Sequence, residues 1–427
     1  MKILAISHIF PPAIDGGSKV VYQLSHQLES QGHDVIYLSS DCSSTDDFIK
    51  KNPSVFQTSL LKKGSLKVSL FKGKTGLSGK GFIYLPVYHH LRRPLKFINL
   101  FIPKNSYFHQ LLQIFQKGPI FKLIPFIRAT IKIIKFKPEL IIAGPLPTTI
   151  ILYANFFRKI LSTKLLINSS FHQSDPDFSR LPLIKTLQQA DYLWTLTKYE
   201  TDFFIKKLNI NQKKIILAGN GVEDIFLKKE KKVSLFKGKT GLSGKGLTIL
   251  FIGSLAAHKR VDLLINSFSR LVKEGIKGRL ILVGQKTLFF PQIKKYFESL
   301  PKSVQKQIHF KFNVSNKDLI TIIDQCQFLV LPSIQESFGL VLVESWARKK
   351  AVITSDIPSL KEIVKSSNGG LTFKTDDIDD LQQKIQQLIF NPKLCRQFGQ
   401  NGYLYVKNNY TWNKVSQKIC QKILPSL

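Results

Sequence analysis

The chain repeats one local pattern, in which a short apolar run is followed by a polar turn and then by apolar residues at helical spacing. It begins with an apolar run at 3–10, a loop containing Gly16 and Gly17, a helix from Ser18 and a second run at 35–39. Strands joined in this way by helices form parallel sheets with right-handed crossovers. The pattern restarts at residue 247 and continues with runs at 279–284, 308–312, 328–331, 351–354 and 370–373. We therefore predict an α/β fold with two doubly wound, Rossmann-like parallel-sheet domains facing one another across a cleft.

The length of 427 residues suits two domains of about 200 residues each. We place an N-terminal domain at 1–225, a C-terminal domain at 226–410 and a final helix at 411–427 that packs back toward the N-terminal domain. A segment of 15 residues occurs twice without a single difference, at 67–81 and 232–246, although the flanking sequences do not repeat. Such identity at two unrelated places indicates inserted loops rather than a structural repeat. A protein lacking both copies is therefore expected to fold and to remain active.

Composition narrows the environment and the partners of the protein. The net charge is +35, but Lys outnumbers Arg by 53 to 10, whereas nucleic-acid surfaces depend strongly on the Arg guanidinium. We therefore expect no nucleic acid partner. The four cysteines have no paired spacing, the first residues lack a signal-peptide cleavage site, and no uncharged run reaches the roughly 20 residues that span a bilayer. These features predict a cytoplasmic protein.

The segment 332–344 gives the strongest functional signal. It follows an apolar run, so it lies at the carboxyl end of a buried strand, and Gly339 begins a helix that we expect to reach about residue 349. The amides of residues 338–340 would be unpaired at the positive end of this helix, which is a favourable place for a phosphate. Glu336 and Glu344 flank the amides and can accept hydrogen bonds from hydroxyl groups. This combination predicts a binding site for a nucleotide sugar.

Two other pairs at expected strand ends are open to a functional and a structural interpretation. Lys259 and Arg260 follow the apolar run at 247–253, where cations can meet diphosphate oxygens. They can also be a solvated pair, although the helix dipole disfavours cations at a helix start. Gly16 and Gly17 form either a packing turn or a loop that lets the backbone approach a substrate.

His172 also follows an apolar run, at 165–168, and so stands at the edge where parallel sheets bind ligands. A lone histidine is commonly structural, but this placement gives an active-site role equal weight. Asp175 and Asp177 resemble a metal-binding Asp-x-Asp pair, yet two carboxylates in a proline-containing loop more commonly form a turn. We therefore expect no metal.

Residues 121–137 are basic and rich in apolar side chains. One helical face is formed by Phe126, Ile127, Thr130, Ile131 and Ile134, with basic residues beside it. We favour a helix that packs this face on the parallel sheet. The alternative is weak association with an anionic membrane through 121–137, at the inner face of the cell membrane, and it requires that the apolar face be partly exposed.

Apart from the two identical segments, the whole chain resembles the retaining nucleotide-sugar glycosyltransferases of family 4, within glycosyl transferases group 1, which have the GT-B fold. The resemblance rests on the opening Pro11-Pro12 with Gly16-Gly17, on Ala190-Asp191, Thr197-Lys-Tyr-Glu200 and Asn220-Gly-Val-Glu223, and above all on Glu336-Ser-Phe-Gly followed by Glu344.

The resemblance implies a metal-independent, retaining hexosyltransferase that moves a sugar from a nucleotide-diphosphate sugar to a hydroxyl of a glycan or lipid-linked acceptor, without a cofactor. It implies that Glu336 contacts the donor sugar near its reacting carbon, that Glu344 accepts from the ribose hydroxyls, and that Lys259 meets the diphosphate. His172 matches the histidine of the family's first domain, and Gly16 and Gly17 match its substrate loop. The remaining donor-binding positions are Gly253, Ser254, Arg260, Gly284, Ser337, Phe338, Gly339 and Leu340.

Two positions depart from the family pattern. Ser254 stands where the family often has Arg, which removes a cation that Arg260 could replace, and Lys349-Lys350 stands where Gly-Lys is usual. Two alternatives remain open at this point. One is a nucleotide-sugar epimerase or phosphorylase of the same fold, and the other is a non-enzymatic, basic nucleic-acid-binding protein.

Overall fold

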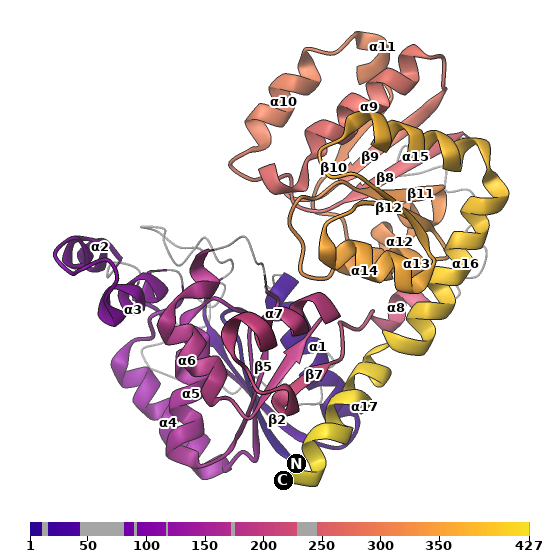
Figure 1. Cartoon of the computed structure of the whole chain (residues 1–427). Coiled ribbons are helices and arrows are strands. Elements are labelled where there is room, and N and C mark those ends of the chain that lie inside the picture. The colour runs from indigo at the N-terminus through magenta and orange to yellow at the C-terminus, as the bar shows by residue number, and fades with distance from the viewer. Residues whose placement is uncertain are drawn as a thin grey trace, which may run out of the picture. The chain divides into compact units, whose positions relative to one another are not determined.

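The computed structural model describes residues 1–10, 16–42, 81–88, 92–116, 118–171, 176–228 and 246–426. They form two compact units, one made of Met1–Gly221 with Val415–Leu427 and the other of Val222–Lys414. Each unit contains one parallel sheet with helices around it (Figure 1). The prediction of two α/β domains with parallel sheets is thus confirmed. The two identical 15-residue segments lie outside the described residues except for their last glycines, Gly81 and Gly246.

The first unit has a seven-stranded sheet in the order β3-β2-β1-β4-β5-β6-β7. Its strands are β1 (Lys2–Ile6), β2 (Asp34–Ser40), β3 (Phe82–Leu85), β4 (Leu140–Ala143), β5 (Lys164–Asn168), β6 (Tyr192–Thr195) and β7 (Ile215–Leu217). Its helices are α1 (Gly16–Ser30), α2 (Arg92–Leu100), α3 (Tyr107–Phe115), α4 (Leu123–Phe136), α5 (Thr149–Leu161), α6 (Leu181–Gln189) and α7 (Lys198–Leu208), with 3₁₀ turns at Pro176–Ser179 and Gln212–Lys214.

The second unit has a six-stranded sheet in the order β10-β9-β8-β11-β12-β13. Its strands are β8 (Leu247–Ile252), β9 (Gly278–Val283), β10 (Ile308–Lys311), β11 (Phe328–Leu331), β12 (Ala351–Ser355) and β13 (Gly370–Phe373). Its helices are α8 (Asp224–Leu227), α9 (Val261–Lys273), α10 (Phe290–Glu298), α11 (Lys302–Gln305), α12 (Asn316–Gln325), α13 (Leu340–Ala347), α14 (Pro358–Ser367), α15 (Ile378–Phe390) and α16 (Pro392–Asn409), with a 3₁₀ turn at Ala257–Lys259. The last helix, α17 (Trp412–Ile423), passes from this unit into the first and ends in a turn at Leu424–Ser426.

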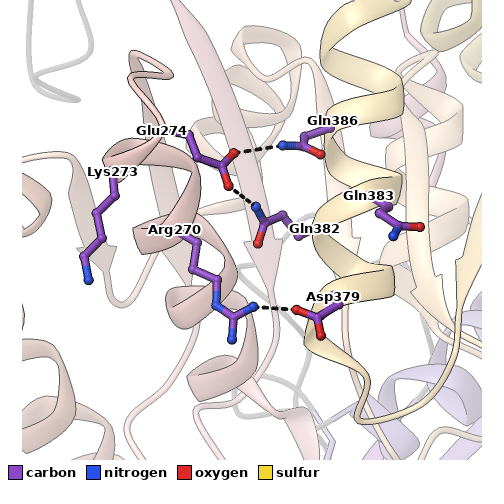
Figure 2. Close-up of a pocket in the computed structure, with 7 residues that line it drawn as sticks. All are labelled: Arg270, Lys273, Glu274, Asp379, Gln382, Gln383 and Gln386. Atoms are coloured by element: carbon purple, nitrogen blue, oxygen red, sulfur yellow. Dashed lines mark hydrogen bonds and ion pairs between the residues drawn. The ribbon is translucent and has the colours of Figure 1, made fainter.

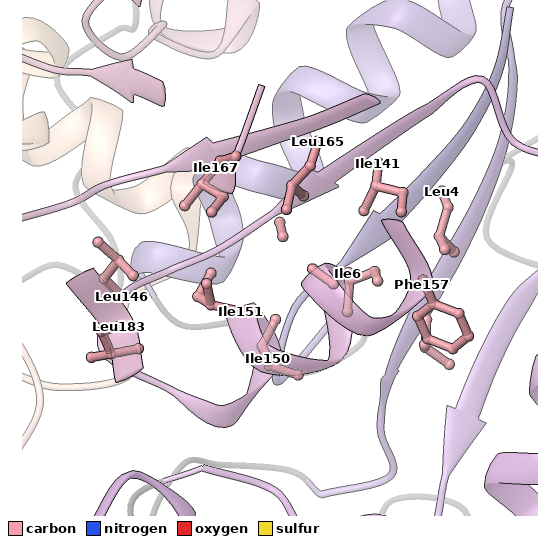
Figure 3. Packing of buried hydrophobic residues seen from close by; sticks show 14 of the residues in the cluster. Leu4, Ile6, Ile141, Leu146, Ile150, Ile151, Phe157, Leu165, Ile167 and Leu183 are labelled. Carbon is pink, nitrogen blue, oxygen red and sulfur yellow. The ribbon is translucent and has the colours of Figure 1, made fainter. Parts of the chain in front are cut away.

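Side chains from neighbouring strands and a covering helix form the core of the first unit. Figure 3 shows Leu4 and Ile6 of β1, Ile141 of β4 and Leu165 of β5 beside residues of α5 such as Phe157, all of them fully buried. Because strands in a doubly wound sheet are covered on both faces, nearly continuous apolar runs are the expected sequence. Burying each such side chain contributes about 1.5–3 kcal/mol relative to leaving it exposed. This explains why the strands could be predicted from the sequence more directly than the other elements.

The boundaries of several elements differ from the predictions. The first strand ends at Ile6 rather than at residue 10, and Ser7 Oγ instead donates to Gly144 O over 2.7 Å. Helix α1 begins at Gly16 rather than at Ser18, so Gly16 and Gly17 belong to its first turn. Helix α13 ends at Ala347 rather than near residue 349, because Lys349 adopts the left-handed conformation with φ of 57°.

Helix α4 packs through a different face from the one that the sequence favoured. Its buried residues are Pro125, Ala129 and Ile133, whereas Ile127 and Ile134, on the predicted packing face, are 48% and 46% exposed. The helix is apolar on every side except the flank with Arg128, Lys132 and Lys135, so its periodicity could not show which apolar side meets the sheet. Of the face that we expected to be buried, Phe126 packs against the core, whereas Ile127, Ile131 and Ile134 are about half exposed.

In both sheets the strand order reverses beside the first strand of the unit. In the first unit β1 has β2 on one side and β4 on the other, and in the second unit β8 has β9 on one side and β11 on the other. The crossover helices on the two sides of the reversal cover opposite faces, so the loops at the carboxyl ends of these two strands diverge and leave a crevice. Ligands of open parallel sheets bind at this point.

Candidate functional site

The reversal point of the second unit brings two predicted segments together. The loop after β8 contains Gly253, Ser254 and Lys259, and the loop after β11 contains Glu336 and leads into α13. The two loops are joined where the Ile334 amide donates to His258 O over 2.9 Å. Lys259 and Glu336, 77 positions apart in the sequence, are thereby held at one edge of the same sheet.

An ion pair between Lys259 and Glu336 lies at the centre of this edge. The Lys259 ammonium donates to Glu336 Oε1, and the two side chains are only 15% and 11% exposed. Because water is largely excluded, the attraction between these charges is stronger than in an exposed pair. An ammonium group has three N–H donors, and among the described residues only Glu336 accepts one of them, which leaves two for a bound anion. The pair thus offers a cation for a phosphate and a carboxylate for a hydroxyl side by side.

Two serines that the sequence analysis did not select hold Glu336 in place. Ser333 Oγ donates to Glu336 Oε1 over 3.1 Å, and Ser359 Oγ donates to Glu336 O over 2.6 Å. Ser355, the last residue of β12, donates through its hydroxyl to Ser333 O and so fixes that loop in turn. The position of Ser355 at the carboxyl end of the neighbouring parallel strand was a signal that could have identified it. Ser359 lies within α14 and had no such signal.

The N-terminus of α13 presents backbone donors to the same edge. Gly339 is the N-cap residue, with φ of 75°, and a Cβ there would come within 3.0 Å of Leu360 Cδ2. Among the residues described, the amides of Phe338, Gly339 and Leu340 donate no hydrogen bond. The Phe338 side chain is buried and packs edge-on against the ring of Tyr410, with 5.1 Å between ring centroids. Phe338 therefore anchors the loop through its side chain and leaves its amide at the helix terminus.

Gly253 and Gly284 lie at the ends of the neighbouring strands β8 and β9. A Cβ on Gly284 would lie 1.7 Å from Gly253 O, and the Gly253 amide donates to Val283 O over 2.9 Å. Gly284 is therefore required for the close approach of the two strand ends. Ser254, the residue after Gly253, is partly exposed.

Arg260 and Glu344 are the remaining predicted donor-binding residues. Arg260 pairs with Asp376 through Nη1 and with Asp262 through Nη2 over 3.4 Å, so its guanidinium is already engaged by two carboxylates. This weakens the expectation that it replaces the cation missing at Ser254. Glu344 is the fifth residue of α13 and is 9% exposed.

The reversal point of the first unit has a different character. A Cβ on Gly17 would lie 2.6 Å from Pro145 Cγ, and Ser7 Oγ contacts Ser18 Oγ at 2.8 Å as well as Gly144 O. Gly17 therefore serves the close packing of α1 on the loop after β4, whereas a Cβ on Gly16 would meet nothing within 4 Å. His172 and Asp175 lie outside the described residues.

Glu200 supports the chain just before His172. It is buried in α7, and its carboxylate accepts from the amides of Phe171 over 2.9 Å and Leu196 over 2.5 Å. Burial raises the pKa of Glu200 to about 7, while the hydrogen bonds from Ser169 and the neighbouring amides act in the opposite direction. Asp177 lies in the 3₁₀ turn Pro176–Ser179 and pairs with Arg180, the N-cap residue of α6.

A pocket between α9 and α15 lies elsewhere on the second unit (Figure 2). Its lining residues pair with one another: Arg270 Nη1 lies 2.6 Å from Asp379 Oδ1, and Glu274 accepts from Gln386 over 2.9 Å. None of the predicted site residues lines it. In the described part of the chain, no cluster of three or more His, Cys, Asp or Glu side chains could hold a metal, and no helix has the length and apolarity needed to cross a membrane.

Part of the chain is similar to known proteins. Residues 233–405 match the family model of glycosyl transferases group 1. An uncharacterized glycosyltransferase of Methanocaldococcus jannaschii, MJ1178, is 29% identical over 55% of this chain and 66% of its own length. Mannosylfructose-phosphate synthase of Agrobacterium fabrum is 24% identical over 54% of this chain and 52% of its own. The chain thus matches about half to two thirds of the length of these curated relatives.

Solved structures are similar over nearly the whole chain. A sucrose-phosphate synthase from Thermosynechococcus elongatus has a TM-score of 0.70 at 17% identity and covers 98% of this chain and 97% of its own. Anabaena Alr3699/HepE in complex with UDP-glucose has a TM-score of 0.70 at 14% identity, with both chains covered in full. Together these likenesses show the GT-B fold, as expected. They give no support to the epimerase, phosphorylase or nucleic-acid-binding alternatives.

Proposed function

We propose that this protein is a retaining glycosyltransferase of the family 4 type, which moves a hexosyl group from a nucleotide-diphosphate sugar to a hydroxyl of a glycan or lipid-linked acceptor. The observation that carries the proposal is the shielded Lys259–Glu336 pair beside the free amides of the α13 N-terminus. Support also comes from the group 1 family match and from the similar fold of a protein that binds UDP-glucose. We extend the donor class of that protein to this chain.

The charges suit a diphosphate leaving group. As the bond between the sugar and the diphosphate breaks, negative charge develops on the departing oxygen. The Lys259 ammonium and the amides of Gly339 and Leu340 would stabilise that charge from fixed positions, without the need to reorganise solvent. These groups supply the positive charge that a metal provides in other transferases, so we propose that the reaction needs no metal or cofactor.

Retention follows if the acceptor attacks from the side that the diphosphate leaves. The departing phosphate oxygen then takes the proton of the acceptor hydroxyl while the new glycosidic bond forms. Glu336, held by Ser333 and Ser359, would accept a hydrogen bond from a sugar hydroxyl and so orient the ring. Glu344 is proposed to accept from the ribose hydroxyls of the donor.

Release of nucleoside diphosphate, measured with a panel of nucleotide sugars and glycan or lipid-linked acceptors, tests this proposal. Turnover is expected to depend on an acceptor and to survive a chelator, and NMR of the product should show the anomeric configuration of the donor. Complete inhibition by the chelator would contradict the metal-free chemistry. Donor consumption without any acceptor would favour an epimerase or a phosphorylase instead.

A further inference from the structure

The outward side of α4 carries an unbroken row of exposed apolar residues, which we call the α4 stripe. Its members are Leu123, Ile124, Ile127, Ile131 and Ile134, exposed by 62%, 61%, 48%, 49% and 46%. The residues that pack inward, Pro125, Ala129 and Ile133, lie on the opposite side of the helix. Fourteen residues at 1.5 Å per residue make the helix about 21 Å long, so the stripe extends along all of it.

The apolar surface continues onto the neighbouring helix. The ring centroids of Phe126 and Phe156 lie 6.0 Å apart, which places α5 directly beside α4. On α5, Phe156 and Ile160 are 43% and 46% exposed at a spacing of one helical turn. Apolar residues scattered singly over a surface are common, whereas neighbouring exposed apolar residues of this kind mark an interaction site.

Positive charge lies beside the α4 stripe. Residues 81–138 contain ten Lys or Arg and no Asp or Glu. Arg128, Lys132 and Lys135 follow one flank of the stripe at helical spacing. None of them belongs to the ion pairs formed among the described residues of the first unit. The surface therefore combines apolar side chains with cations that no carboxylate among the described residues neutralises.

This combination discriminates between possible occupants. A second copy of the same face would bring cations against cations without any carboxylate to neutralise them, which opposes self-association. Nucleic acid would satisfy the cations but would leave the isoleucines in contact with water. A bilayer with anionic headgroups satisfies both, because apolar side chains enter the acyl boundary while Lys and Arg stay among the headgroups.

We propose that α4 docks lengthwise on an anionic lipid bilayer, with the α4 stripe inserted and Arg128, Lys132 and Lys135 on the headgroups. The proposal does not rest on the glycosyltransferase activity. It makes the association peripheral and salt-sensitive, because part of the attraction is electrostatic and is screened by ions.

Co-sedimentation of the full chain with vesicles tests the proposal. The chain is expected to bind vesicles of phosphatidylcholine containing about one third phosphatidylglycerol, and to bind pure phosphatidylcholine at least about tenfold more weakly. Replacing Ile124, Ile127 and Ile131 together with Gln, a good helix former, is expected to weaken binding by more than about tenfold. Replacing Arg128, Lys132 and Lys135 with Gln is expected to weaken it about a hundredfold.

Matched controls separate docking from general charge and general apolarity. Lys206, Lys207 and Lys213 are exposed in the same unit, and their replacement with Gln removes the same charge away from α4. Phe390 is 72% exposed on α15 of the other unit, and Phe390→Gln removes apolar surface there. Both controls should keep wild-type binding. The proposal would be overturned if the controls lost as much binding as the α4 variants, or if the Ile variant bound as well as the wild type. It would also be overturned if sedimentation equilibrium showed a dimer that the Ile substitutions dissociate.

Discussion

The two reversal points of the molecule share a topology and differ in chemistry. In the second unit the loops after β8 and β11 hold a shielded cation and carboxylate next to free amides. In the first unit the described residues after β1 and β4 are tied together by Ser7, Gly17 and Pro145 in close packing. A parallel sheet thus provides the same crevice twice, and the side chains at its edge decide what that crevice does.

The largest expected effect is on turnover, at the edge of the second unit. Glu336→Gln and Lys259→Met are each expected to lower kcat/KM by about 10²–10³-fold, because each removes a fixed charge from the reacting groups. Steady-state release of nucleoside diphosphate measures this. Lys198→Met is the matched control, since it breaks an exposed ion pair with Asp202 in the first unit. If the control lost as much activity as Lys259→Met, the comparison between the two edges would fail.

A second effect concerns stability, at the edge of the first unit. Gly17→Ala is expected to lower the free energy of unfolding by about 1–3 kcal/mol, because the added methyl group overlaps Pro145. Gly16→Ala, one residue earlier in the same helical turn, meets open space and is expected to be neutral or slightly stabilising. Urea unfolding of both variants checks the difference. A Gly17→Ala protein with wild-type stability and lost turnover would restore the substrate-loop interpretation.

A third effect depends on pH and lies in the first unit. The pKa of Glu200 is raised by burial from 4.5 to about 7 in the folded state, so between these values the folded chain binds more protons than the unfolded chain. The free energy of unfolding is therefore highest, with respect to Glu200, below pH 4.5. It falls as the pH rises through 7, by about 3 kcal/mol in total. Unfolding titrations at several pH values should show this fall.

Glu200→Gln provides the control for that titration. The variant is expected to be less stable at low pH, because its amide cannot accept from both Phe171 and Leu196, but to lack the fall between pH 4.5 and 7. The readout is therefore the slope and not the level of stability. An unchanged slope in the variant would assign the pH dependence to another group.

The smallest expected effect is on stability, at the C-terminal end of α13. Lys349, two residues after the end of α13, has φ of 57°, a conformation that glycine adopts at lower cost. Lys349→Gly is expected to raise the free energy of unfolding by about 0.5–1 kcal/mol, less the contact of its ammonium with the ring of Tyr403 at 4.9 Å. Thermal unfolding measures the gain, and turnover should not change. A destabilised variant would show that the ring contact outweighs the backbone strain.

Strands and the loops that follow them were predictable because buried parallel strands have nearly continuous apolar sequences. Lys259 follows one such run and Glu336 follows another, so both were expected at the carboxyl-end edge of one sheet. The ion pair itself could not be predicted, because it joins residues 77 positions apart whose side chains meet only in the fold. The same holds for the contact between Gly17 and Pro145.

Helices were harder to interpret where they are apolar on several sides. In α4 both the inward set with Ala129 and Ile133 and the outward α4 stripe fit a helical period, so periodicity alone offered two answers. Ser359 was missed for another reason. A serine inside a helix gives no sign that its hydroxyl holds the backbone of a distant loop.

Donor binding tests the central claim most directly. Saturation-transfer NMR of the full chain with a panel of UDP, GDP and ADP sugars is expected to show binding of at least one nucleotide sugar. That signal should be lost in Lys259→Met and retained in Lys198→Met, because only Lys259 lies beside Glu336 and the N-terminus of α13. Absence of binding by every nucleotide sugar, or equal binding by wild type and Lys259→Met, would contradict the assignment of the donor site to this edge of the second unit.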